Sequence, residues 1–229
     1  MPHELDAARL DRSRPLRDQI YDMVRHLILT GRIAPGEVLD EKHMAAQLRI
    51  SRTPVREAVK KLSDENLVDV VAQSGTRASR VSRNEVEQAY LIRRALEMES
   101  AAQAAGRMNE AAADLLNDIL ASHARALERH RYTEAIGIDD RFHRTIAEIS
   151  NLDRLWRAIE ISKAQLDRCR HVMLPREGQG EATLEQHREI IRALNSRNPE
   201  RARKAMGDHL QMAFSSTLKV IESGEFETK

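Results

Sequence analysis

The stretch at positions 51–56 constrains this chain more than any other, and it reads Ser-Arg-Thr-Pro-Val-Arg. It opens a segment in which Val55, Val59 and Leu62 recur at spacings of four and three, so that they share one face of a helix. The serine is a natural N-cap, and the proline lies in the first turn, where a missing backbone N–H costs nothing. The pattern therefore predicts a helix over residues 51–64 with one buried face.

The other faces of this predicted helix carry side chains that suit contact with DNA. Arg52, Thr53, Arg56 and Lys60 all lie off the apolar face. Arginine and threonine side chains can bind base edges, so Arg52 and Arg56 are candidates for guanine readout. Thr53 suits either a base edge or a phosphate. Phosphate contact alone is the alternative role for each arginine.

The residues before this helix indicate a helix-turn-helix motif. A first helix is predicted over residues 15–29, ended by Gly31, and a short second helix over residues 41–48, capped by Asp40. Only three residues separate the second helix from the predicted recognition helix. Two helices joined by so short a turn are typical of this motif.

Two short β-prone runs follow the recognition helix, at residues 67–71 and 77–81. The turn predicted between them, at residues 73–76, contains Gly75, and the pattern is typical of a β-hairpin. A hairpin in this place would be the wing of a winged helix. Residues 1–13 are polar without periodicity, and we expect them to form a flexible leader to a DNA-binding domain over residues 1–81.

From Ser82 onward the apolar periodicity is that of helices alone. The expected helices span residues 83–106, 109–130, 133–150, 152–173, 181–195 and 199–222. The last one starts clearly, because Asn198 is a natural N-cap and Pro199 suits the first helical position. We expect residues 82–229 to form an all-α bundle of about six helices, which makes the whole chain mainly α with a small β-hairpin.

Composition restricts the compartment and the partners. The 229 residues include one cysteine, Cys169, which cannot form an internal disulfide and fits a reducing compartment. No apolar run approaches the roughly 20 residues that span a bilayer, so we expect a cytoplasmic protein without a membrane partner. The net charge is only +1, but residues 42–80 hold eight Lys or Arg against four Asp or Glu. That local excess fits DNA contact.

A second group of residues suggests a metal site in the helical region. Asp139 and His143 are four residues apart on a predicted helix, so both lie on one face about one turn apart. Two further histidines, His187 and His209, lie on later predicted helices. Three imidazoles and one carboxylate suit a borderline divalent ion, with zinc as the expected ion and nickel or manganese as alternatives.

Other interpretations of these four residues stay open. The chain has nine histidines, and a single histidine on a helix is more often a surface or hydrogen-bonded core residue than a ligand. A site with open coordination positions could also activate water as a metal-dependent hydrolase does, but no second acid or base stands out beside it. The site could instead sense the metal ion itself.

Both halves of the chain resemble one family. The motifs at residues 15–16, 31–36, 51–58 and 67–68 look like the winged-helix domain of GntR-type transcriptional regulators. The later motifs look like the ligand-binding bundle of the FadR subfamily, the FCD domain. These are residues 91–97, the Asp139-x-x-Phe-His143 motif, His187, and a final helix from Pro199 to His209. The resemblance covers residues 15–222.

The resemblance implies a set of contacts and a regulatory function. Operator contacts would come from Arg52, Thr53 and Arg56, with Gly75 entering the minor groove and Lys42 lying near phosphate. The chain would act as a homodimeric repressor on a palindromic operator, rather than as an enzyme.

The resemblance also implies how the helical domain works. The metal ligands would be Asp139, His143, His187 and His209. A small carboxylate or hydroxy-acid effector would bind the metal, and Arg93 would pair with its carboxylate. Arg94 is the alternative to Arg93 if the helical phase differs by one residue.

Two residues depart from the family pattern. Arg49 stands in the turn where the family often has glycine, and Asn66 replaces a common glycine after the recognition helix. Asparagine tolerates a positive φ well. Arg49 would cost roughly 1 kcal/mol if its turn requires a left-handed residue, although its guanidinium could add a phosphate contact.

Overall fold

The computed structural model describes residues 5–11, 13–71 and 75–224. They divide into two compact units, one that extends to Ser82 and a second over Arg83–Ser223. The prediction of a mainly α-helical fold with a small antiparallel sheet is confirmed. No helix in the described ranges combines the length and the apolar character needed to cross a membrane.

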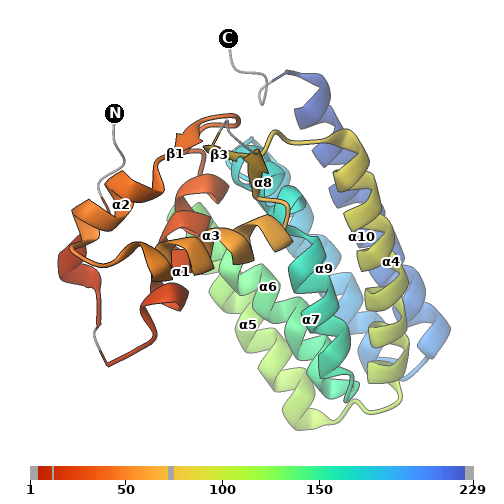
Figure 1. Cartoon of the computed structure of the whole chain (residues 1–229). Coiled ribbons are helices and arrows are strands. Elements are labelled where there is room, and N and C mark those ends of the chain that lie inside the picture. The colour runs from red at the N-terminus through yellow and green to blue at the C-terminus, as the bar shows by residue number, and fades with distance from the viewer. Residues whose placement is uncertain (1–4, 12, 72–74, 225–229) are drawn as a thin grey trace. The chain divides into compact units, whose positions relative to one another are not determined.

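The first unit contains the predicted helices. Helices α1, α2 and α3 span Leu16–Leu29, Glu41–Leu48 and Arg52–Asp64 (Figure 1). Gly31 follows the end of α1 with a φ of 71°, as a glycine that ends a helix does. The Asp40 carboxylate caps α2 by accepting hydrogen bonds from the backbone N–H groups of Lys42 and His43.

Part of the expected flexible leader has regular structure. A short 3-10 helix covers Ala7–Arg9, and the Asp6 side chain caps it by accepting a hydrogen bond from the Ala8 N–H. Leu5 is buried. The polar composition of the segment concealed this buried apolar contact, and the expectation of a flexible leader over residues 1–13 stays a prediction.

Helix α3 buries the face that its spacing predicts. Val55, Val59 and Leu62 are all buried, together with Ala58, and α3 packs on α1. Two hydrogen bonds join the C-terminal end of α3 to α1, because Glu65, the C-cap of α3, accepts from the Tyr21 hydroxyl and from the Arg25 Nε. One side of α3 is therefore held against α1, while Arg52, Thr53 and Arg56 are exposed.

A three-stranded antiparallel sheet completes the unit, in the order β1-β3-β2. Strands β1, β2 and β3 span Val38–Leu39, Val68–Val71 and Gly75–Ala78. Gly75 pairs with Val71 and Thr76 with Val70, so the second run starts two residues earlier than predicted and ends at Ala78. The rest of the predicted turn, at residues 73–74, lies outside the described residues. Strand β1 was not predicted, because two residues are too short for a visible alternation.

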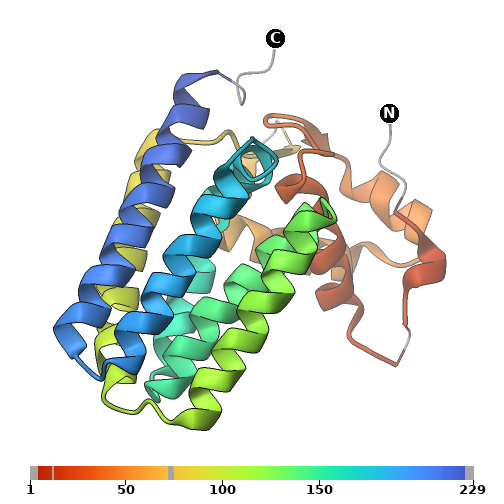
Figure 2. The same cartoon turned by 180° about the vertical axis from the view of Figure 1, so that it is seen from behind.

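The second unit is helical throughout its described residues. Helices α4, α5 and α6 span Arg83–Ala105, Glu110–Glu128 and Tyr132–Ile149. Helices α9 and α10 span Gln179–Asn195 and Pro199–Glu222. The two longest helices, α4 and α10, run side by side (Figure 1). From behind, α9 lies between α10 and α5 (Figure 2).

One predicted helix is two. The span expected at residues 152–173 breaks at Lys163 into α7, Asp153–Ser162, and α8, Ala164–Met173. The unit therefore has seven helices in its described part rather than about six. The Lys163 side chain is buried and donates hydrogen bonds to Asp140 on α6 and Asp167 on α8. These contacts lie at the break between α7 and α8. No proline or glycine marks this break in the sequence.

The core of the second unit lies among α4, α5, α6, α9 and α10. It is almost entirely aliphatic, and its larger members include Leu116, Ile119, Phe142, Ile146 and Ile190. Phe142 stacks on the ring of His187, with ring centroids 4.1 Å apart and planes at 11°. The core therefore continues directly into a cluster of buried histidines.

Candidate metal and DNA-binding sites

Three helices bring the four predicted metal-ligand residues together. Asp139 and His143 come from α6, His187 from α9 and His209 from α10, and all four are at most 6 % exposed. Each lies on the apolar face of its helix, which explains why the bundle turns these polar side chains inward. Packing the helices then forces the side chains into one buried cluster.

Short distances join the possible ligand atoms. The Nε2 atoms of His143 and His209 are 3.3 Å apart. The Asp139 carboxylate lies between the imidazoles of His187 and His143, with Oδ1 3.4 Å from the His187 Nε2 and Oδ2 3.7 Å from the His143 Nε2. Two ligands that are each about 2.0–2.1 Å from one ion, at a tetrahedral angle, lie about 3.4 Å apart. The spacing therefore fits a shared ion.

Two neighbouring side chains orient the imidazoles. The Nδ1 of His143 is 2.6 Å from the Glu97 Oε2, and the Nδ1 of His209 is 2.8 Å from the Gln186 Oε1. The His209 contact is a hydrogen bond when Nδ1 carries the ring proton, whereas the His143 contact is a close ion-pair contact without hydrogen-bond geometry. The two Nε2 atoms then face each other with lone pairs, which a cation would satisfy. Carboxylate–histidine pairs of this kind are usual around protein metal sites.

Buried atoms without partners point to the same conclusion. Neither ring nitrogen of His187 makes a hydrogen bond within the described residues, although His187 is fully buried. Leaving a buried polar atom unsatisfied costs about 1–3 kcal/mol. An ion held by His143, His187 and His209, whose ligand atoms lie within 4.8 Å of one another, would use one of these nitrogens. The residues present therefore fit a divalent metal ion.

The electrostatics keep the ligands in the forms that bind metal. Burial, followed by the nearby imidazoles, lowers the pKa of His187 well below its usual range and that of His209 to about 3, so both rings are neutral. Burial alone would raise the pKa of the Asp139 carboxyl. The positive charge of Arg170, the largest opposing cause, outweighs it and holds that pKa well below its ordinary value. Asp139 is therefore ionised.

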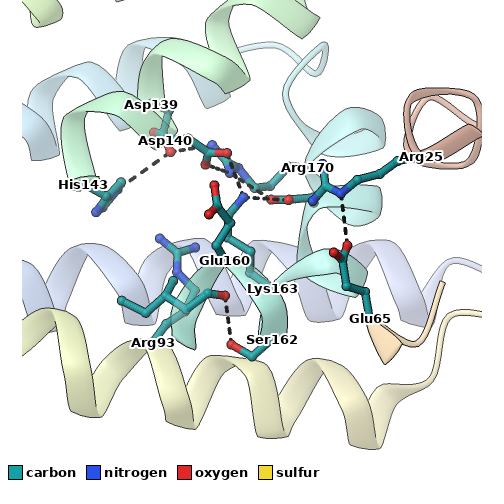
Figure 3. A network of polar contacts seen from close by, with 12 residues as sticks. Arg25, Glu65, Arg93, Asp139, Asp140, His143, Glu160, Ser162, Lys163 and Arg170 are labelled. Atoms are coloured by element: carbon teal, nitrogen blue, oxygen red, sulfur yellow. Dashed lines mark hydrogen bonds and ion pairs between the residues drawn. The ribbon is translucent and has the colours of Figure 1, made fainter. Parts of the chain in front are cut away.

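Arg170 on α8 is a residue of this site that the sequence did not suggest. Its guanidinium donates hydrogen bonds to Asp139 and Asp140 on α6 and to Asp167 on its own helix (Figure 3). Lys163 joins the last two carboxylates, at 2.7 and 2.6 Å.

His123 on α5 was also missed. It is 1 % exposed, and its ligand atoms lie within 4.8 Å of those of Asp139 and His187. Its ring centroid is 5.6 Å from that of His187. A signal was available, because Leu116, Ile119, His123 and Ala126 follow the spacing of a buried helical face.

A cavity of about 50 Å³ adjoins the cluster. Its polar lining includes Arg93, Arg170, His123, Asp139 and His209. Arg93 is buried on α4 with its Nε 2.6 Å from the Glu97 Oε1, and Figure 3 shows its side chain near those of Asp139 and His143. The alternative residue, Arg94, is exposed and lines a separate surface depression. Arg93 is thus the arginine of this pair that reaches the cavity.

The residues expected to contact DNA are exposed in the first unit. Arg52, Thr53 and Arg56 lie on the outer side of α3, and Lys42 lies in the first turn of α2. Gly75 is exposed, with a φ of 86° and open space around the position that a Cβ would take.

Both departures from the family pattern adopt left-handed backbone conformations. The φ of Arg49, the C-cap of α2, is 53°, and the φ of Asn66 is 57°. The turn of the helix-turn-helix thus needs the conformation that favours glycine. Arg49 is exposed, so its guanidinium is available to a phosphate.

Comparison with known proteins assigns both units. Residues 16–77 match the family described as bacterial regulatory proteins, gntR family, and residues 88–212 match the FCD domain. The HTH-type transcriptional repressor RspR of Escherichia coli K12 is 32% identical over 212 residues, which cover 93% of each chain. A probable D-xylose utilization operon transcriptional repressor of Paenarthrobacter nicotinovorans is 29% identical over 87% of each chain.

Solved structures share the fold. E. coli McbR/YncC aligns with a TM-score of 0.76 at 23% identity, over 89% of this chain and 97% of that one. A putative GntR transcriptional regulator from Rhodococcus sp. RHA1 aligns with a TM-score of 0.72 at 24% identity, over the same shares. At these identities the likeness concerns the fold alone.

Proposed function

The chain belongs to the GntR family of bacterial regulatory proteins and carries an FCD domain, and we propose that it is a repressor controlled by a small carboxylate at a metal site. The family and the relatives that it matches are transcription regulators. This chain is likewise a DNA-binding transcription regulator and not an enzyme. The observation that carries the proposal is the cluster of buried histidines and Asp139 beside two cavity arginines. A protein that acts on the chromosome would work in the cytoplasm.

The proposed DNA contacts rest on the exposed side of α3. Arg52 and Arg56 would read guanine edges in the major groove, a contact worth about 1–3 kcal/mol of discrimination. Thr53 would bind a base edge or a phosphate. Lys42 would neutralise a phosphate, and the backbone at Gly75 would approach the minor groove. Their exposure supports these assignments.

Operator variants test base readout by Arg56. The operator is first selected from a random DNA pool, and binding of the Arg56→Ala variant is then measured on that site and on single-base variants. We expect Arg56→Ala to lose discrimination at one position in each half-site, whereas Lys42→Ala weakens binding on all sequences and lowers the salt dependence. A uniform loss in Arg56→Ala would reject the base-reading role.

The metal would be held by Asp139, His143, His187 and His209. When bound, the ion supplies concentrated positive charge and open coordination positions that suit an anionic oxygen. Glu97 and Gln186 would fix the orientation of the rings through the Nδ1 contacts of His143 and His209. Zinc is the proposed ion, with nickel and manganese as alternatives.

The effector would be a small carboxylate or hydroxy acid. Arg93 lines the cavity, and Glu97 contacts its Nε, so the terminal nitrogens suit a second carboxylate. The volume of about 50 Å³ favours a ligand of few atoms. Titrating the metal-loaded protein with acetate, lactate and malate while following operator affinity tests this assignment. Arg93→Lys should weaken the response, because an ammonium cannot form the same planar fork.

A repressor of this kind would act as a homodimer on a palindromic operator. Two recognition helices related by a twofold axis would then read two half-sites. Large apolar side chains on the neighbouring helices α4 and α7 support self-association, because Leu91 and Ile161 are 60 % and 58 % exposed. Light scattering of the purified protein should give twice the chain mass. A monomer at micromolar concentration would contradict this part of the proposal.

A metal sensor is the second candidate. The small cavity favours it, since a site that binds the ion alone needs no room for an organic ligand. Chelation followed by addition of single metals separates the two candidates. A sensor changes its operator affinity with the metal alone over a narrow concentration range. The proposed repressor changes it with a carboxylate at constant metal.

A further inference from the structure

We propose that His123 is a fifth protein ligand of the ion held by Asp139, His143, His187 and His209. The inference rests on the metal site proposed above and concerns a residue outside that ligand set. It changes the expected donor set from three imidazoles and a carboxylate to four imidazoles and a carboxylate.

The side chain of His123 is buried without a hydrogen-bonding partner. It is 1 % exposed, and neither its Nδ1 nor its Nε2 makes a hydrogen bond to a described residue. A leucine would fill the same space on α5 without the desolvation cost that an unsatisfied polar group carries. The ring therefore needs a partner that the polypeptide does not provide.

The position of His123 identifies that partner. Its ligand atom lies within 4.8 Å of those of Asp139 and His187, and both of these also face the cluster that contains His143 and His209. The two groups of possible ligands share His187, whose two nitrogens also lack hydrogen bonds. His123 lines the same cavity as Asp139 and His209. The five ligand atoms do not all lie within 4.8 Å of one another, so His123 would reach the shared ion from the side of Asp139 and His187 by a shift of its side chain.

Two separate ions are a poor alternative on grounds of charge. Among the described residues, Asp139 is the only carboxylate common to the cavity lining and the possible ligand groups, and it already pairs with Arg170. Arg93, which pairs with Glu97, adds a second positive charge beside the cavity. A second divalent ion would add two more positive charges beside these guanidinium groups with no further carboxylate among the possible ligands described, so one ion is favoured over two.

A fifth donor alters which ions the site prefers. Protein zinc sites are almost always tetrahedral with four ligands. Five protein donors exceed that number, so ligation by His123 would shift the preference from zinc to nickel, the alternative named above that imidazole nitrogen also suits. One remaining position would be left for an effector oxygen.

The test counts imidazole ligands with Co²⁺ as the probe. The full-length protein is stripped of metal and loaded with Co²⁺, and proton NMR then records the ring N–H signals that the paramagnetic ion shifts and that disappear in D₂O. Each ligating histidine contributes one such signal. The variants are His123→Phe, which keeps a ring without donors, and His123→Ala. The matched control is His43→Phe, at an exposed histidine of α2.

We expect four shifted signals in the unmodified protein and in His43→Phe, and three in the His123 variants. Co²⁺ affinity, measured by competition with a chelator, should fall about tenfold or more in the His123 variants. Three signals in the unmodified protein would overturn the inference and leave the proposed metal site standing. A chain that binds no Co²⁺ and no Ni²⁺ would refute the metal site itself.

Discussion

Arg170 on α8 is partly buried and binds three aspartates. Asp139 and Asp140 come from α6, and Asp167 comes from α8. Burying each of these charges alone would cost a large desolvation free energy. Removing one partner from such a network leaves the others as uncompensated charges. The network therefore fixes α8 against α6 while keeping Asp139 ionised beside the histidines.

Removing the Arg170 charge should destabilise the protein. We expect Arg170→Gln to lower the free energy of unfolding of the metal-free protein by about 3 kcal/mol, because Asp139 would lose its charged partner. The control is Arg144→Gln, which breaks an exposed pair with Glu160 and should cost about 1 kcal/mol or less. Urea denaturation of both variants gives the comparison, and equal losses would contradict the assigned role of Arg170.

Cys169 provides a prediction on pH. Burial raises the pKa of its thiol from 9.0 to about 12. Between those values the unfolded chain has lost a proton that the folded chain retains, so stability should fall as the pH rises, by about 1 kcal/mol per pH unit. The Cys169→Ala variant lacks this contribution, and the difference between the two unfolding curves at pH 9 and pH 11 measures it. A constant difference would show that the thiol does not titrate in this way.

At the residue scale, sequence patterns identified the proposed metal ligands more readily than the residues that position those ligands. Asp139 and His143 stand out because their spacing alone places them on one face of a helix. Arg170, Glu97 and His123 do not stand out, because their significance depends on which helices pack together. His123 was the exception that periodicity could have revealed, had the buried face of α5 been followed through it.

At the scale of the elements, the turn between α2 and α3 has a strained backbone at Arg49. Arg49 adopts a φ of 53°, which costs a non-glycine residue roughly 1 kcal/mol. We expect Arg49→Gly to raise the free energy of unfolding by up to about that amount. If Arg49 also contacts a phosphate, the same variant should bind operator DNA more weakly and with a smaller salt slope. A destabilised Arg49→Gly protein would contradict the strain argument.

The helices were predictable where local chemistry marks their ends. Asp40, Asn109 and Asn198 each accept backbone hydrogen bonds at a helix start, and α2 and α10 have the predicted bounds. The break at Lys163 and the two-residue strand β1 were not predictable. Both depend on partners distant in the sequence, since Lys163 binds Asp140 and β1 pairs with β3.

At the scale of the whole molecule, the proposal joins a DNA-reading unit to a metal-holding unit in one chain. A ligand that binds both conformations of a regulator equally well shifts nothing, so the effector must favour one arrangement of the DNA-binding units. A tenfold change in operator affinity corresponds to about 1.4 kcal/mol of coupling. A charge-assisted hydrogen bond between Arg93 and a carboxylate can supply a coupling free energy of this size.

The most direct test measures operator affinity in three states of the same protein. Fluorescence anisotropy on a DNA site selected by the protein would compare the metal-free protein, the metal-loaded protein, and the metal-loaded protein with a series of small carboxylic acids. We predict tight binding to a palindromic site that at least one acid weakens tenfold or more, and no such response in a His143→Ala, His187→Ala double variant. Identical affinities in all three states would contradict the proposed control of DNA binding by the helical domain.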